Sequence, residues 1–101
     1  MANSTVVFSK RARNSLEKLL TFLETEWSIK VKREYRDKLE RCVLQISKHP
    51  DSCPVSEEFP GLHKCVVTKQ TTFYYRVNEK EVQVITFYDN RQDPKKLKPL
   101  L

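Results

Sequence analysis

Glycine is almost absent from this sequence of 101 residues, which contains one, Gly61. Phosphate-binding loops need several glycines, because their backbone must turn tightly and approach the phosphate closely. Histidine is nearly as scarce, and His49 and His63 stand alone, without the spacing of metal ligands or of a hydrolase triad. The sequence therefore excludes a glycine-rich nucleotide site, and it predicts neither a metal nor any other cofactor.

Three cysteines, Cys42, Cys53 and Cys65, are scattered along the chain without a CxxC motif. A disulfide framework or a zinc site would need a different pattern, so we expect reduced, partly buried thiols. Long apolar runs are missing too. None approaches the roughly 18 residues of a membrane span, and the N-terminus lacks the apolar region of a signal peptide. We therefore expect a cytoplasmic protein that does not enter a membrane.

Basic residues, in contrast, are abundant: 19 Lys and Arg against 13 Asp and Glu give a net charge of +6. Aromatic residues make up 10% and charged residues 32% of the chain. This composition is typical of a folded domain with a heavily charged surface, and the length predicts a single domain over residues 1–101. The positive charge predicts an anionic partner, either nucleic acid or an acidic protein.

Two stretches have the apolar spacing of amphipathic helices. The first begins after Ser9, a good N-terminal cap, and ends near Glu26. The second begins after Ser28 and ends before Pro50. Because the two helices are joined so tightly, we expect an antiparallel hairpin whose apolar edges face a sheet. The apolar stripes consist of Ala12, Leu16, Leu19, Leu20, Leu23 and Trp27, and of Val31, Tyr35, Leu39, Cys42, Val43 and Ile46.

Four stretches are rich in residues that favour strands: 5–8, 62–68, 71–77 and 82–88. The last is nearly continuous in apolar residues, which predicts a central strand. Residues 51–60 have no periodicity and predict a loop. The order β-α-α-β-β-β predicts an α+β fold, with a four-stranded, mainly antiparallel sheet and the two-helix hairpin on one face. We expect the other face to be partly open.

A basic segment follows the last predicted strand and contains Arg91, Lys95 and Lys96. The planar guanidinium of Arg91 suits a two-pronged contact with a phosphate or a carboxylate. On the two preceding strands, Tyr88 and Arg76 are expected on an open sheet face, where an aromatic ring can stack on a base or anchor a protein partner. These five residues, Arg76, Tyr88, Arg91, Lys95 and Lys96, form the predicted target-binding or anion-binding site.

Nearly the whole chain resembles the RelE/ParE toxins of bacterial type II toxin–antitoxin modules. The most specific parts are FYYRV at residues 73–77, similar to a strand motif of that family, and VITFYDNRQDP at 84–94, similar to its final strand and following arginine. The resemblance implies a toxin held in a hetero-oligomeric complex by a cognate antitoxin. It further implies one of two kinds of target.

RelE-like members cleave mRNA in the ribosome without a metal, whereas ParE-like members poison DNA gyrase. Of the nuclease residues that the resemblance implies, Arg91 alone is matched and would be catalytic. The strand lysines fall near His63 and Cys65, and an arginine falls near Thr72. The sequence therefore favours a ParE-like toxin that acts by binding. A RelE-like ribosome-dependent mRNA endoribonuclease and a basic RNA-binding module remain the alternatives.

Overall fold

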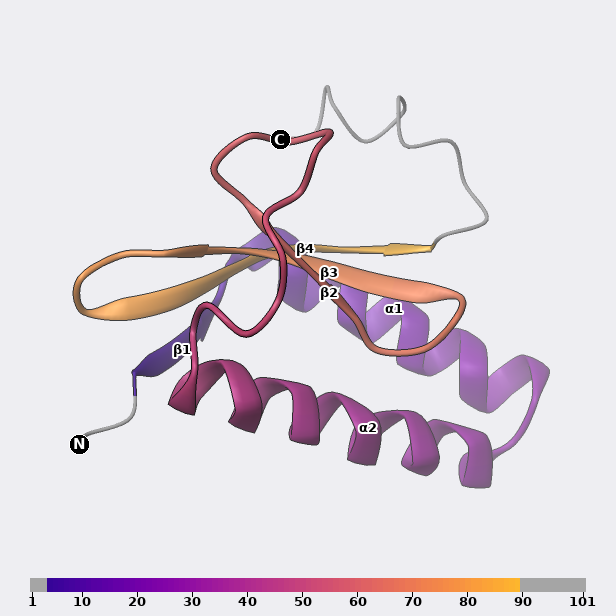
Figure 1. Ribbon diagram of the computed structural model, residues 1–101. Coiled ribbons are helices and arrows are strands. Elements are labelled where there is room, and N and C mark those ends of the chain that lie inside the picture. The colour runs from indigo at the N-terminus through magenta and orange to yellow at the C-terminus, as the bar shows by residue number, and fades with distance from the viewer. Residues whose placement is uncertain (1–3, 90–101) are drawn as a thin grey trace.

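The computed structural model describes residues 4–89 and arranges them as two layers, a sheet and a helix pair (Figure 1). Strand β1 (Thr5–Phe8) leads into the helices α1 (Lys10–Glu26) and α2 (Ile29–Lys48). The strands β2 (His63–Val66), β3 (Thr71–Val77) and β4 (Glu81–Asp89) follow. Neither helix is long and apolar enough to cross a membrane.

The four strands form one sheet in the order β1-β4-β3-β2, with both helices on the same face (Figure 1). β4 pairs antiparallel with β3, which pairs antiparallel with β2, and β1 joins β4 in parallel. The predicted α+β fold, the mainly antiparallel sheet and the central position of the last strand are confirmed. β2 is shorter than the predicted strand 62–68, because Val67 and Thr68 turn back onto Thr71, whose carbonyl oxygen accepts from both of their amides.

Serine caps set both helix starts, as the sequence predicts. The Ser9 hydroxyl accepts a hydrogen bond from the Ala12 amide at 3.0 Å, and Ser28 accepts one from Val31 at 3.1 Å. Ser9 also donates to the carbonyl oxygen of Ile85 at 2.7 Å. One side chain therefore caps α1 and fixes its first turn to the central strand of the sheet.

The main core lies between the helices and the sheet. Val82, Val84 and Phe87 all face it from β4, a spacing that strict strand alternation does not allow. The register between β3 and β4 shifts at Tyr74 and Tyr75, which leaves Ile85 as the extra residue of a bulge. The core consists of Ala12, Tyr35, Leu39, Ile46, Cys65, Phe73, Tyr75, Val82, Val84 and Phe87.

A second, smaller core lies on the opposite face, beneath the segment between α2 and β2. Phe59 and Leu62 pack there with Tyr74 and Tyr88, which are 2% and 7% exposed. Gly61, at φ 88°, permits the turn that brings Leu62 back to the Phe59 carbonyl oxygen. The prediction of an open aromatic face is therefore wrong, because a loop without periodicity carries two apolar residues that cover it.

Candidate functional site

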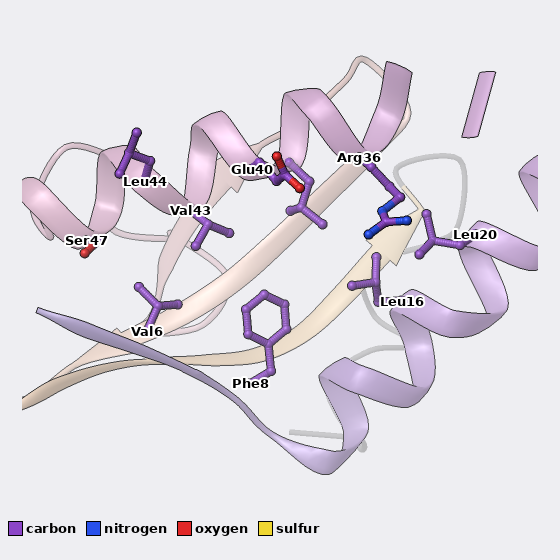
Figure 2. A pocket seen from close by; sticks show the side chains of 10 residues that line it. Val6, Phe8, Leu16, Leu20, Arg36, Glu40, Val43, Leu44 and Ser47 are labelled. Carbon is purple, nitrogen blue, oxygen red and sulfur yellow. The ribbon is translucent and has the colours of Figure 1, made fainter. Parts of the chain in front are cut away.

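An apolar groove runs between β1, α1 and α2 and has a volume of about 560 Å³ (Figure 2). Val6 and Phe8 of β1 form its floor, Leu16 and Leu20 form one wall, and residues of α2 form the other. This size is within the range of pockets that hold a ligand or an anchoring side chain. The groove is lined by Val6, Phe8, Leu16, Leu20, Arg36, Leu39, Glu40, Val43, Leu44 and Ser47.

The groove exists because the apolar stripe of α2 is wider than the core that it covers. Leu39 is buried against the sheet, whereas Leu44, which lies beside the stripe next to Val43, is 53% exposed. On β1, Val6 and Phe8 point toward the helices and are only half-buried. Both helices and the strand thus leave part of their apolar surface uncovered, along one continuous channel.

The rim of the groove is charged. The guanidinium of Arg36 reaches from α2 toward Leu16 and Leu20, and Glu40 lies one turn further along (Figure 2). Helical spacing places Arg33 next to Arg36 and Arg13 next to Leu16, and both are exposed. Lys48 lies one turn beyond Leu44. The same spacing places Glu17 next to Leu20 and Asp37 next to Arg33, and both are exposed, so charges of both signs border the apolar channel.

This arrangement suits binding rather than catalysis. The lining offers one hydroxyl, from Ser47, and that hydroxyl already donates to the carbonyl oxygen of Ser4 at 2.7 Å. An apolar stripe with acidic residues beside it would complement both the channel and its rim.

Of the predicted site residues, Arg91, Lys95 and Lys96 lie outside the described residues. Arg76 is exposed on β3, on the face away from the helices, opposite Gln83. Tyr88 is buried on β4 and lies opposite Thr72 of β3. Thr72 is four residues from Arg76 along β3. At about 3.3 Å per residue, this spacing separates Arg76 and Tyr88 by roughly 13 Å. The structure therefore does not bring these two side chains into one site.

Of the three positions at which the resemblance implies nuclease cations, 65 and 72 are buried and 63 is half-buried. Cys65 is buried against the helices, and the ring of His63 stacks on Tyr75 with 4.9 Å between ring centroids. Thr72 is buried. Lys64 points to the opposite face, where it pairs with Tyr74 and is half-buried. Strand alternation places position 72 on the opposite face of the sheet from positions 63 and 65, so the three positions do not form one cluster.

A second hollow, of about 420 Å³, lies at the far end of the helix hairpin, against the turn between β2 and β3. Trp27, predicted on the apolar stripe of the first helix, is 68% exposed there, because α1 ends at Glu26. Tyr35 forms the inner wall. Burial raises the pKa of Tyr35 to about 12, and a contact with the Thr71 side chain opposes that shift. Lys32 and Glu24 join the two helices nearby, with 3.6 Å between Nζ and Oε1.

Sequence reasoning missed the groove, although one signal was present. Leu44 lies beside the predicted stripe of the second helix and not on it, next to Val43. An apolar residue that widens a stripe beyond the buried edge marks surface left for a partner. Phe59 was also missed as a core residue, because nothing in the spacing of residues 51–60 indicates which of them pack on the sheet, whereas Leu62 was predicted as the first residue of a strand.

Comparison with known families gives one match that covers most of the chain. A family model described as ParE toxin of type II toxin-antitoxin system, parDE, matches residues 6–94. A comparison with curated proteins gives no match.

Solved structures share the architecture at low sequence identity. A chain of the chromosomal ParDE TA system from P. aeruginosa superposes with a TM-score of 0.73 at 12% identity, over 85% of this chain and 95% of that one. The YoeB/ParE toxin from Agrobacterium tumefaciens gives 0.62 at 14% identity, with 85% and 98% covered. The toxin-antitoxin complex RelBE2 from Mycobacterium tuberculosis gives 0.60 at 17% identity, with 87% and 99% covered. These likenesses establish the fold.

Proposed function

The chain belongs to the family of ParE toxins of type II toxin–antitoxin systems, and we propose that it arrests growth by binding an essential target and is neutralised by a cognate antitoxin. The resemblance seen in the sequence motifs at 73–77 and 84–94 is confirmed at the level of the family. The family match over residues 6–94 is the observation that carries the proposal. The proposal adds two things to the family assignment: an essential target and action by binding. The resemblance implies DNA gyrase as an example of such a target.

We assign the groove between β1, α1 and α2 to the antitoxin. An amphipathic segment would place apolar side chains against Leu16, Leu20 and Leu44, and this burial would set the dissociation rate. Acidic residues on the same segment would face Arg36 and Arg33. Charge complementarity of this kind mainly raises the association rate.

Action by binding, and not by RNA cleavage, is supported by what occupies the nuclease positions. Transfer of a phosphoryl group without a metal needs cations that stabilise the developing charge. Positions 63, 65 and 72 carry His, Cys and Thr, and the last two are buried. Arg91 would be left as a single guanidinium, which suits one contact with an acidic or phosphate group better than catalysis.

The test is expression of the chain under tight control, with and without the product of the adjacent gene. We expect growth arrest from the chain alone, altered plasmid supercoiling with intact mRNA, and rescue when the neighbour is present. Growth, supercoiling and primer extension on mRNA are scored in the same cultures. Position-specific mRNA cuts would replace the binding mechanism with the nuclease one, and a failure of the two products to form a complex would remove the antitoxin assignment.

A further inference from the structure

Three cysteines that are far apart in the sequence meet on the helix-covered side of β2. Cys65 is buried in the main core, and Cys42 of α2 and Cys53 of the following loop are half-buried against it. All three are free thiols. The thiol of Cys65 interacts with those of both Cys53 and Cys42. No group of three or more metal-ligating side chains within residues 4–89 has the arrangement of a metal site, so the proximity calls for another chemistry.

The loop before β2 runs antiparallel to it in a fixed register. Val55 forms a bridge with His63, the Lys64 amide donates to the Pro54 carbonyl oxygen at 2.9 Å, and the Ser56 amide donates to Leu62 at 2.7 Å. In each of these three pairs the two residue numbers add up to the same value, which means that all three belong to one antiparallel register. Continuing the register by two residues from the bridge places Cys53 directly opposite Cys65.

In this extrapolated register Cys53 and Cys65 would form a pair without hydrogen bonds between its own two backbones. The hydrogen bonds fall on the neighbouring pairs, 54 with 64 and 56 with 62. In such a pair the Cα atoms lie about 4.5 Å apart and the side chains point to the same face. A disulfide spans Cα distances of about 4.4–6.8 Å. The imidazole Nδ1 of His63, 2.7 Å from the Cys53 carbonyl oxygen, holds the two segments together at this point.

The geometry points to a reversible disulfide between Cys53 and Cys65, formed when the protein meets a peroxide. The thiolate of Cys53 attacks one peroxide oxygen, the O–O bond breaks, and a sulfenic acid forms on Cys53. The sulfur of Cys65 then displaces the hydroxyl group and closes the S–S bond. In total the two thiols lose two electrons and two protons, and hydrogen peroxide becomes two molecules of water.

The environment sets the order of these steps. Cys53 is the more accessible thiol of the pair, since Cys65 is 5% exposed. Burial raises the pKa of the Cys65 thiol, and likewise that of Cys42, so few thiolates form at these two positions near neutral pH. The first attack therefore falls to Cys53, and Cys65 acts as the resolving thiol.

The disulfide would lock the cover of the outer sheet face. The segment that it closes, residues 53–65, contains Phe59 and Leu62, which pack on Tyr74 and Tyr88. In the reduced protein this segment is held by packing and a few hydrogen bonds. In the oxidised protein a covalent bond would join the two ends of this segment, so the segment would separate from the sheet less often.

Peptide mapping tests the pairing directly, because trypsin separates the three cysteines. Cys42 falls in the peptide 42–48, Cys53 in 49–64 and Cys65 in 65–69. After the folded protein is treated with hydrogen peroxide and its remaining thiols are blocked, we expect 49–64 joined to 65–69, lighter by two hydrogen atoms than the sum of the two. Dithiothreitol should restore both peptides. A bond between 42–48 and 65–69, or sulfinic acid on Cys53 without a crosslink, would overturn the proposal.

Two variants separate the crosslink from general effects of oxidation. Cys53→Ser should abolish the joined peptide, and Cys42→Ala should leave it in place. Peroxide should raise the thermal midpoint of the wild type and of Cys42→Ala by about 5 °C or more, since closing a loop of this size stabilises a small domain. The midpoint of Cys53→Ser should not rise. An equal rise in all three proteins would assign the effect to other oxidation and reject the disulfide.

Discussion

At the scale of single residues, Arg91 and Tyr35 are singled out by two different kinds of observation. Arg91 is identified by its motif, because it follows the last strand within the segment at 84–94 that resembles the family. Tyr35 is identified by its surroundings, because its hydroxyl is buried at the far end of the helix hairpin. The role that we propose for Arg91 concerns the target, and that of Tyr35 concerns the stability of the fold.

Arg91→Ala should weaken growth inhibition while the unfolding midpoint stays that of the wild type. Arg91→Lys should restore part of the activity, because a point charge cannot reproduce a two-pronged contact with a carboxylate or phosphate. Growth of cells that express equal amounts of each variant gives the measurement. Full toxicity of Arg91→Ala would show that the contact with the target lies elsewhere.

Tyr35 should make the protein lose stability at alkaline pH. Its pKa is about 12 in the folded protein, against an ordinary value near 10 for an unfolded chain. Folding therefore favours the protonated form. This contribution, on the order of 2 kcal/mol, is fully present below pH about 10 and is lost as the pH rises toward 12.

Denaturant unfolding of the wild type and of Tyr35→Phe between neutral pH and about pH 11 measures this effect. The free energy of unfolding should fall more steeply with pH in the wild type, because the phenylalanine cannot ionise. Burial raises the pKa of Tyr74 and of Tyr75 too, so the variant should keep part of the slope. Identical slopes in the two proteins would show that Tyr35 ionises without a penalty.

At the scale of elements, α2 carries two exposed aliphatic side chains that serve as a matched pair. Leu44 lies in the groove and Ile29 at the start of the helix, and each is 53% exposed. Leu44→Glu would place a carboxylate in the apolar channel. We expect antitoxin affinity to fall about 30-fold or more, in line with a loss of about 2 kcal/mol at a central contact.

Ile29→Glu is the control, because it adds the same charge to the same helix outside the groove. A carboxylate is favourable near a helix N-terminus, so the fold should tolerate this change. Titration calorimetry with the purified antitoxin compares the two variants. Equal losses for both would indicate a general charge effect and would contradict a docking site in the groove.

The elements that the sequence predicts well are those that local chemistry defines. Ser9 and Ser28 cap their own next turn, and the apolar spacing of each helix is repeated over several turns, so both helices could be placed from the sequence. The cover formed by Phe59 and Leu62 could not, because it depends on where a loop without periodicity meets the sheet. The groove could not either, since only the distance between α1, α2 and β1 decides how much of each apolar stripe stays uncovered.

At the scale of the whole molecule, the net charge of +6 should raise the rate at which the protein associates with an acidic partner. An acidic partner is attracted over about one Debye length, which shrinks from roughly 14 Å at 50 mM salt to about 4–5 Å at 500 mM. We expect the association rate with the antitoxin to fall about tenfold or more over this range, and the dissociation rate to change little. Stopped-flow mixing at several salt concentrations gives both rates. A salt effect confined to dissociation would argue against electrostatic steering.

The parallel pairing of β1 with β4 has a consequence for how the chain is made. The hydrogen bond from the Ser9 hydroxyl to Ile85 joins residues 76 positions apart, and within residues 4–89 β1 pairs with β4 alone. During synthesis the first strand therefore has no partner among these strands until β4 has emerged from the ribosome. Contacts this far apart slow folding, because a large loop must close first. A product that stops before β4 lacks the central strand, and with it the place of β1 and the floor of the groove, so the groove that we propose for the antitoxin cannot form before β4 has been made.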